Sequence, residues 1–501
     1  MLFVEVARTW ADVASTRSRL AKVARLAETL AALDDEERAA GTAMLTGAPR
    51  QGRMGVGWAS LRDLEVAPAG EPTLSVADVD DAFATLATTS GPGSVARRSR
   101  VLEDLWGRAT TDEQSLLRGL VLQEVRQGAL EGVVLAAVAR AAAVDEPVVR
   151  RAAMLSGDLT AAAVVAMEDG AEALAAIGLE VGRPVLPMLA SSEPDLAAAL
   201  ARTGPARVDT KFDGMRIQVH RTGDDVAVFT RSLRDVTGDL PRVVEAARGL
   251  AADTVVLDGE ALALDDDGRP RAFQDTMSGD THLRPVFFDL LHLDGTDLLD
   301  EPLTTRREAL ARVAPDHLAD GVETDDPEVG TDHLRAALAA GHEGVVVKSL
   351  DAPWEAGRRG ASWVKVKVAH TLDLVVLAAE WGSGRRRGWL SNLHLGAVDD
   401  DTGEVVMLGK TFKGLTDELL AWQTEAFLAR ETSRSDHVVH VRPELVVEIA
   451  FDGVQSSSRY PGGVTLRFAR VKRYRDDKRV EDADTLQTVR DIHRGVITPE
   501  V

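Results

Sequence analysis

The stretch Ala206-Arg207-Val208-Asp209-Thr210-Lys211-Phe212-Asp213-Gly214-Met215-Arg216 lies near the middle of the 501-residue chain. Polarity alternates before Lys211 as in a strand, and the residues that follow Arg216, Ile217 to His220, have the composition of a second strand. The dipeptide Asp213-Gly214 is a strong turn signal. The pattern predicts two strands joined by a turn, with Lys211 and Arg216 facing the same side.

A lysine in this position can act as a covalent nucleophile. An amine held among cations and partly desolvated loses its proton more easily and gains a free lone pair. Asp213 is placed to orient the amine, and Gly214 lets the backbone approach a ligand because it has no Cβ. The same residues also fit a plain hairpin with charged ends, so the rest of the chain has to decide.

The whole chain has the composition of a globular protein of roughly two to four domains, with 45% hydrophobic and 28% charged residues. The first residues, Met1 to Val6, lack the basic flank and long apolar core of a signal peptide. The most apolar stretch, Gly132 to Val144, contains Arg140 and is shorter than the span of about 18 residues that crosses a membrane. We therefore expect a cytoplasmic protein.

The absence of cysteine excludes disulfides, thiol nucleophiles and cysteine-based zinc modules. The net charge of −22 argues at first against a nucleic-acid partner. The distribution of charge along the chain matters more than the net charge, however. A local basic groove is compatible with the clusters Arg358-Arg359, Lys365 to Lys367, Arg385 to Arg387 and Arg467 to Arg479.

Three regions differ in their patterns. Residues 1–180 are predicted to be helical, because Trp10 to Leu33, Asp112 to Val144 and Pro147 to Met167 carry apolar residues at three-and-four spacing. Residues 181–190 contain two prolines and a glycine, which is typical of an interdomain linker.

In residues 191–368, strands alternate with helices, and charged residues stand at the strand ends or along one face. Any single one of them fits a solvent-facing residue. As a set they indicate several strands that direct polar groups into one cleft.

Residues 369–501 contain many short strands and one helix, Asp417 to Arg430. This predicts a small β-barrel, for which the oligonucleotide-binding (OB) fold is the commonest type that handles nucleic acid.

At this point the ordered motifs resemble those of the covalent nucleotidyltransferases and, among them, the three-domain ATP-dependent DNA ligases. The stretches Thr46-Gly47, Gly55 to Trp58, Pro184 to Ala190 and Val446 to Ser457 extend the resemblance to nearly the whole chain. The motifs that carry it are Lys211 to Arg216, Phe229 to Ser232, Asp258 to Glu260, Phe287 to Asp289, Glu343 to Lys348, Lys365 to Lys367 and Arg475 to Lys478.

The resemblance implies a multidomain fold: an all-α DNA-binding domain (1–180), a linker (181–190), an α+β nucleotidyltransferase core of the ATP-grasp-like ligase type (191–368) and a C-terminal OB-fold barrel (369–501). It also implies a reaction on nicked double-stranded DNA, with ATP as co-substrate and Mg²⁺ as cofactor. Lys211 would take AMP from ATP, AMP would pass to the 5′-phosphate of the nick, and the 3′-hydroxyl would then displace it. The enzyme is expected to act as a monomer.

The same resemblance assigns the site residues. Lys211 and Asp213 would be catalytic, with Asp213 contacting the lysine or the 3′ end of the nick. Glu260 and Glu343 would hold the metal, or Glu260 would hold the ribose instead. Phe288 would stack on adenine, and the phosphate contacts of the barrel would form only if it swings over the cleft. The residues expected to bind the nucleotide are Asp209, Arg216, Arg231, Glu260, Phe288, Arg359, Lys365, Lys367, Arg475 and Lys478.

Three positions depart from the family pattern. Asp209 stands where the family usually has glutamate, so its shorter arm changes the expected reach to adenine. Ala469 replaces a frequent proline, and Trp354 replaces a frequent tyrosine.

Alternatives from other classes are less well supported. An RNA ligase or a GTP-dependent capping enzyme uses the same lysine chemistry, but capping enzymes lack a large helical N-terminal module. An NAD-dependent ligase would carry a cysteine-based zinc module, which this sequence cannot form. A non-catalytic nucleic-acid-binding protein would be expected to lose Lys211 or the acidic residues. The resemblance to DNA ligases implies a part in DNA repair, replication and recombination.

Overall fold

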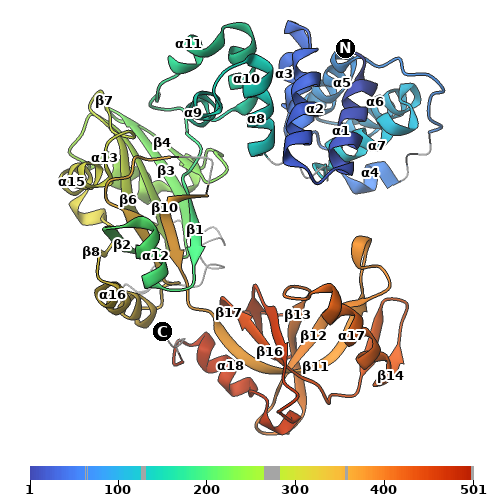
Figure 1. Ribbon diagram of the computed structural model, residues 1–501, viewed down its shortest axis with the longest axis vertical. Coiled ribbons are helices and arrows are strands. Elements are labelled where there is room, and N and C mark those ends of the chain that lie inside the picture. Colours follow the sequence, from blue (N-terminus) through green and yellow to red (C-terminus); the bar gives the residue numbers. More distant parts are fainter. Residues whose placement is uncertain (63, 65, 126–130, 264–282, 356–358, 498–501) are drawn as a thin grey trace.

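The computed structural model describes residues 1–501 except 63, 65, 126–130, 264–282, 356–358 and 498–501. Figure 1 shows three groups of elements along the chain: helices first, then a mixed region of sheets and helices, and a strand-rich C-terminal region. Both outer groups adjoin the mixed region. In the described part of the chain no helix is long and apolar enough to cross a membrane.

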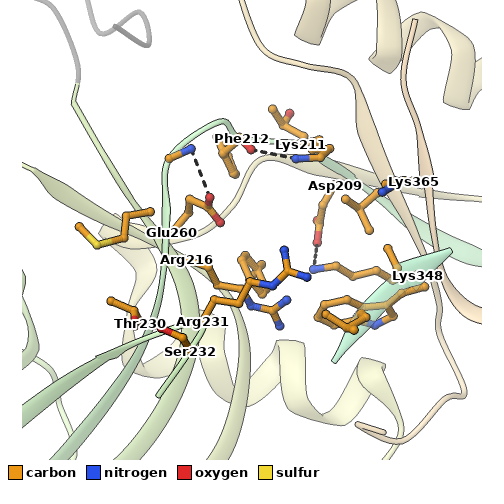
Figure 2. Close-up of a pocket in the computed structure, with 18 of the residues that line it drawn as sticks. Asp209, Lys211, Phe212, Arg216, Thr230, Arg231, Ser232, Glu260, Lys348 and Lys365 are labelled. Atoms are coloured by element: carbon orange, nitrogen blue, oxygen red, sulfur yellow. Dashed lines mark hydrogen bonds and ion pairs between the residues drawn. The ribbon is translucent and has the colours of Figure 1, made fainter. Parts of the chain in front are cut away.

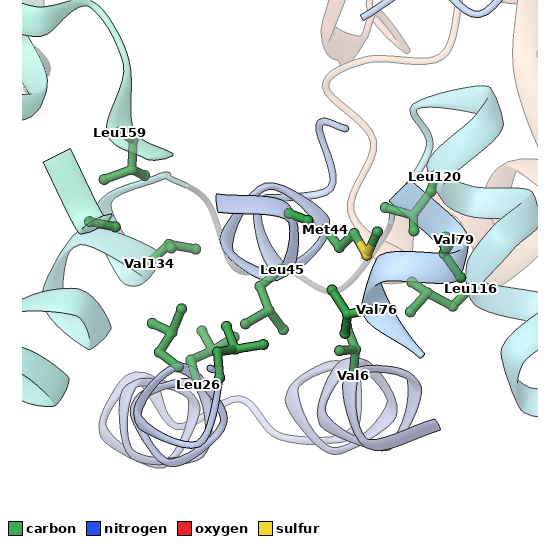
Figure 3. Close-up of a cluster of buried hydrophobic side chains, with 14 of the residues drawn as sticks. Val6, Leu26, Met44, Leu45, Val76, Val79, Leu116, Leu120, Val134 and Leu159 are labelled. Carbon is green, nitrogen blue, oxygen red and sulfur yellow. The ribbon is translucent and has the colours of Figure 1, made fainter. Parts of the chain in front are cut away.

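The N-terminal region is helical, as predicted. Its side chains share one hydrophobic core, in which residues of several helices point toward the same interior, among them Val6, Leu26, Leu45 and Leu116 (Figure 3). The helices are α1 (Phe3–Ser15), α2 (Arg19–Ala31), α3 (Arg38–Thr46), α4 (Trp58–Arg62), α5 (Val76–Thr88), α6 (Ser94–Arg108), α7 (Thr111–Leu122), α8 (Glu131–Ala142), α9 (Glu146–Ser156), α10 (Leu159–Glu168) and α11 (Gly170–Ala175).

Each of the three stretches predicted to be helical is divided between two helices in the structure. Ser18 caps the start of α2 by accepting a hydrogen bond from the amide of Ala21, which separates α2 from α1. Gly157 adopts a left-handed conformation after α9, and Asp158 then caps α10. Amphipathic periodicity continues through such breaks, so it does not reveal them.

The mixed region contains two five-stranded sheets. The first has the order β1 (Leu189–Glu193), β10 (Arg359–Val366), β9 (Val345–Ser349), β2 (Ala206–Thr210) and β8 (Gly321–Thr324), and its core includes side chains of α12 (Leu196–Thr203) and α16 (Pro327–Ala339). The second has the order β4 (Asp225–Thr230), β3 (Met215–Thr222), β5 (Thr254–Leu262), β6 (Arg284–Leu293) and β7 (Thr296–Asp297), and its core includes α13 (Pro241–Arg248) and α15 (Leu303–Val313).

The predicted hairpin around Asp213-Gly214 is wrong. Strands β2 and β3 include the residues expected to form strands, but they belong to different sheets, and Lys211 to Gly214 form the crossing between them. Gly214 is needed there because a Cβ would lie 2.5 Å from the carbonyl oxygen of Ala261. The loop that carries Lys211 therefore lies where the two sheets meet.

The C-terminal region is built on a seven-stranded sheet with its own hydrophobic core. Its main path is β13 (Val405–Thr411), β12 (Leu390–Val398), β11 (His370–Trp381), β15 (Val438–Val441) and β14 (Glu431–Arg434), and β16 (Val446–Phe451) pairs with both β11 and β19 (Arg470–Tyr474). Strands β17 (Gly453–Ser456) and β18 (Val464–Arg467) form a separate pair. Besides the expected helix α17 (Asp417–Leu428) there is a second one, α18 (Leu486–His493).

Short 3₁₀ helices complete the described elements. They lie at Asp35–Glu37, Thr237–Asp239, Pro315–His317, Gly384–Arg386 and Val480–Asp482.

Candidate active site

A cavity of about 790 Å³ opens beside the crossing loop. Both sheets and the end of the predicted linker contribute to its wall (Figure 2). Its volume lies in the range of about 300–1,000 Å³ that is usual for small-molecule sites. The lining residues are Leu189, Ala190, Asp209, Thr210, Lys211, Phe212, Gly214, Met215, Arg216, Thr230, Arg231, Ser232, Arg234, Glu260, Phe288, Val346, Lys348, Trp363 and Lys365.

Lys211 is fixed by the chain that precedes β9. Its main-chain amide donates to the carbonyl of Gly344 at 2.8 Å, and the amide of Glu343 donates back to the carbonyl of Lys211 at 3.2 Å. The ammonium Nζ lies 2.6 Å from Oε2 of Glu343 and donates to the carbonyl of Phe212 at 3.1 Å. Two segments far apart in the sequence thus hold one amine at the cavity.

Glu343 lies between two lysines. Its carboxylate is 2.6 Å from Nζ of Lys211 and 2.8 Å from Nζ of Lys367. Burial raises the pKa of Glu343, but the two ammonium groups together bring it below its usual value, so the carboxylate is ionised. Lys367 also lies 3.7 Å from Asp452 of the C-terminal region. Lys365 lines the cavity, whereas Lys367 and Glu343 stand outside its lining.

Asp209 forms a buried ion pair with Lys348, at 2.7 Å (Figure 2), and its other oxygen lies 2.8 Å from Nε of Arg207. Burial opposes both charges. Nearby cations, Lys348 first, nevertheless lower the pKa of Asp209, and burial lowers the pKa of Lys348. Lys348 was not predicted as a site residue. Its signal in the sequence is a single charge directly after Val345 to Val347.

Two aromatic rings form one wall of the cavity. Phe288 and Trp363 meet edge to face with centroids 5.9 Å apart. The ammonium of Lys348 lies 4.3 Å from the centroid of Phe288 and 4.5 Å from that of Trp363. Trp363 is a second site residue that was not predicted from the sequence, although it lies two residues before Lys365 and so shares one face of the strand with it.

Arg216 and Glu260 project from neighbouring strands, β3 and β5, into the cavity. Arg216 donates to both carboxylate oxygens of Asp258, at 3.0 and 2.6 Å, and to the carbonyl of Met188 at 2.7 Å. Glu260 accepts from the amide of Gly214 at 3.2 Å. Burial raises the pKa of Glu260 to about 7 although Lys211 and Arg216 oppose the shift.

The remaining predicted nucleotide contacts are distributed differently. Exposed Arg231 lies at the edge of the cavity, and of Arg359 the structure describes the backbone at the start of β10 but not the side chain. Arg475 and Lys478 do not line the cavity, because both bind Asp373 at 2.7 Å. Arg475 also binds Asp477 at 2.6 Å, so this cluster is held within the C-terminal region.

The carboxylate of Asp213 is paired with a cation of the C-terminal region rather than with the amine of Lys211. Its carboxylate is bound by the guanidinium of Arg467, which lies on β18 of the C-terminal region. Arg467 was not predicted individually. The pair joins the crossing loop to the C-terminal region.

The acidic residues suit a hard cation only in part. Within the described ranges there is no group of three or more histidine or carboxylate side chains placed to hold a metal. Mg²⁺, however, is commonly bound by one or two carboxylates together with phosphate and water. Glu260 in the cavity and Glu343 beside Lys211 supply that smaller set of oxygen ligands.

Comparisons with known proteins identify the class of enzyme. Three family models match: "DNA ligase N terminus" over residues 59–139, "ATP dependent DNA ligase domain" over 187–367 and "ATP dependent DNA ligase C terminal region" over 386–478. A protein described as a probable DNA ligase from Nocardioides sp. is 61% identical over 503 residues, covering 98% of both chains. One with the same description from Saccharopolyspora erythraea is 57% identical over 499 residues, again covering 98% of both.

The chain therefore belongs to the ATP-dependent DNA ligase family, as its motifs predicted, and it is a ligase that uses ATP as co-substrate. A solved structure described as Pmar-Lig_PreS3 has the same fold, with a TM-score of 0.61, 18% identity, and coverage of 94% of this chain and 99% of that one. A capping enzyme and a non-catalytic binding protein are not favoured.

Proposed function

We propose that the cavity binds ATP and that Lys211 is the nucleophile of nick sealing. The observation that carries this proposal is the placement of the Lys211 amine at a cavity between two sheets, fixed by Gly344 and Glu343. In the first step the neutral amine attacks the α-phosphorus of ATP. An N–P bond forms, the bond between the α- and β-phosphates breaks, and pyrophosphate leaves.

Some of the lining residues suit the adenine base of ATP, and others suit its phosphates. The aromatic wall of Phe288 and Trp363 offers apolar surface to adenine, and the buried pair of Asp209 and Lys348 offers polar groups at its edge. Lys365 reaches the cavity from the same strand face as Trp363, where it can neutralise phosphate charge. Arg231 can contact the ribose or the phosphates from the edge.

Glu260 and Glu343 are the residues that would hold Mg²⁺, and the ion would neutralise charge on the phosphates. In the ligand-free protein, Glu343 binds the amines of Lys211 and Lys367. A nucleotide that draws Lys367 toward its phosphates would leave Glu343 free to accept the proton that Lys211 must lose before attack.

In the second and third steps AMP passes to the 5′-phosphate of a nick, and the 3′-hydroxyl displaces it to form the phosphodiester bond. The C-terminal region offers a surface for DNA at Phe412 and Phe468, which are both 57% exposed. Lys413 lies 5.2 Å and Arg467 5.7 Å from the ring of Phe468. Exposed aromatic rings beside cations can insert between bases while the cations bind phosphates.

We also propose that the C-terminal region is a closed OB barrel, with domains at 1–180, 191–368 and 369–501 and a monomeric enzyme. Two hydrogen bonds outside the regular β-ladders support closure of the barrel. The amide of Val471 on β19 donates to the carbonyl of Lys413, just after β13, at 3.0 Å. The hydroxyl of Thr411 on β13 donates to the carbonyl of Ala469. These bonds bring β13 to β19 and would complete the ring of β11, β12, β13, β19 and β16.

The test is covalent labelling with α-labelled ATP and Mg²⁺. The native protein is expected to acquire a label that resists denaturation, and Lys211→Ala is expected to acquire none. Lys472→Ala, at an exposed lysine of β19, is the matched control and should label normally. Labelling of Lys211→Ala would contradict the assignment of the nucleophile, and labelling with GTP instead of ATP would contradict the assignment of the substrate.

A further inference from the structure

The segment between the helical region and the nucleotide cavity is bound along its length rather than free. It was predicted as a linker from its prolines and glycine, at residues 181–190. In the structure Val185 and Met188 are buried, with exposed fractions of 0% and 1%. They belong to one hydrophobic cluster with Met154 and Leu155 of α9 and with Trp363 of the cavity wall.

Side chains of a single strand bind the main chain of this segment. Arg216, Gln218 and His220 alternate along β3 and so share one face of it. Gln218 accepts from the amide of Val185 at 2.8 Å and donates to its carbonyl at 3.2 Å. Arg216 donates to a carbonyl further along the segment, that of Met188, at 2.7 Å.

His220 completes the row. Its Nδ1 accepts from the amide of Gly182 at 3.0 Å, so its proton is on Nε2, which donates to Oε1 of Gln218 at 2.8 Å. Gln218 and His220 are 5% and 1% exposed. Buried polar side chains need such partners, and here the partners are almost entirely the linker backbone.

The bound segment joins three parts of the molecule. The amide of Leu186 donates to the carbonyl of Met154 in α9 at 3.1 Å. Gly182, Val185 and Met188 bind side chains of β3 in the second sheet. At its end, Leu189 begins β1 of the first sheet, and Leu189 and Ala190 line the cavity.

We infer that Gln218 and His220 are positioning residues for the ligase reaction: they hold residues 182–188 against β3 and thereby set Leu189 and Ala190 as a wall of the nucleotide site. The linker then connects the helical region to that site as a fixed strap. The inference rests on the proposed ATP cavity for its kinetic consequence, but the binding of the segment to β3 does not depend on ATP.

Loss of these contacts should affect the affinity for ATP more than the rate of AMP transfer to Lys211. Lys211 is held by Gly344 and Glu343 rather than by residues 182–188. Loss of the wall should therefore weaken ATP binding and leave the step itself intact. We expect the KM for ATP in self-adenylation to rise about fivefold or more in Gln218→Leu, with the maximal rate within about twofold of native.

The experiment combines that titration with hydrogen exchange of the full-length protein. In Gln218→Leu the peptide spanning 182–188 should exchange faster while β5 keeps its protection. Ile217→Val is the control, because Ile217 is the neighbouring residue on the opposite, core-facing side of β3. It should change neither the KM nor the exchange of the linker. Unchanged linker exchange in Gln218→Leu, or faster exchange with an unchanged KM, would overturn the inference.

A measurement without any variant guards against a failure of Gln218→Leu to fold. In the native protein the linker peptide should exchange more slowly with ATP present than without it, because the nucleotide packs against Leu189 and Ala190. An unchanged rate in a protein that does take up AMP would refute the strap. Absence of AMP uptake would instead refute the proposed function, and slow exchange of the ligand-free linker would still stand.

Discussion

Glu260 shows how the cavity alters the chemistry of a single residue. Its carboxyl is half-buried on β5 and has one main-chain donor, Gly214. The field of Lys211 and Arg216 favours the carboxylate, but burial outweighs it and raises the pKa to about 7. The group therefore titrates near neutrality, and a bound ligand can favour either the protonated or the ionised form.

This shift predicts a pH-dependent stability. In the unfolded chain the carboxyl loses its proton near its ordinary value, and in the folded protein near 7, so the folded state binds more protons between these values. Stability contributed by Glu260 is present at low pH and is lost as pH rises to about 7, by about 3 kcal/mol at most. Glu260→Gln should remove this loss.

Urea unfolding in EDTA at a series of pH values measures the effect. The free energy of unfolding of Glu260→Gln should rise relative to native between about pH 4.5 and pH 7 and then run parallel. Glu404→Gln, at an exposed position, controls for the loss of a carboxyl group. A constant difference between Glu260→Gln and native over this range would show that the carboxyl is not perturbed.

At the scale of elements, the approach of β9 to β10 sets the position of Lys211. Gly344 has φ +138°, and a Cβ there would lie 2.3 Å from the carbonyl oxygen of Val366. Its own carbonyl accepts from the amide of Lys211. A side chain at this position would therefore displace the backbone that fixes the nucleophile.

Gly344→Ala is expected to cost about 3 kcal/mol of stability, from backbone strain and the clash, and to slow AMP labelling at saturating ATP. Gly403→Ala is the control: Gly403 has φ +70° and open space where the Cβ would be, so only about 1 kcal/mol is expected and labelling should be unaffected. Equal effects of the two substitutions on labelling would show that the contact with Lys211 has no special importance.

Local sequence patterns predicted the positions of the strands and helices well, but not which strands pair with one another. The alternation before Lys211 and after Arg216 marks β2 and β3 correctly, but no local signal says that they pair with different sheets. Asp213-Gly214 lies in the loop that crosses from one sheet to the other, where a Cβ at position 214 has no room. The same dipeptide in a hairpin turn would look identical in the sequence. The helical break at Ser18 was likewise hidden within continuous periodicity.

The candidate site was predictable to the extent that it is built from ordered motifs. The family resemblance placed Lys211, Glu260 and Phe288 at one cavity, and the structure brings them there. It assigned no role to Lys348 or Trp363, because their roles depend on packing beside Asp209 and Phe288, which only the folded structure shows. Arg467 was missed for the same reason, since its partner Asp213 is 254 positions away.

At the scale of the whole molecule, the distribution of charge explains how an acidic chain can handle DNA. The net charge is −22, yet cations concentrate around the C-terminal strands. Arg475 and Lys478 are bound to Asp373, and Arg467 binds Asp213. We infer that the C-terminal region must change these partners to bring Arg475 and Lys478 to the β- and γ-phosphates of ATP.

This rearrangement predicts unequal effects on the steps. Lys478→Ala should slow labelling by ATP about tenfold or more, because the step involves pyrophosphate, and slow the sealing of a pre-adenylated nick by no more than about threefold. Lys472→Ala, on the preceding strand β19, should leave the labelling rate unchanged. Equal losses in both steps for Lys478→Ala would contradict the rearrangement.

The central claim is that this chain seals DNA nicks through Lys211. The most direct measurement is the sealing of a singly nicked, end-labelled duplex with Mg²⁺ and either ATP or NAD⁺, with the native protein and with Lys211→Ala. We predict sealing with ATP alone and none with the variant. Sealing by Lys211→Ala, or AMP uptake by the native protein with the nick left open, would contradict the claim.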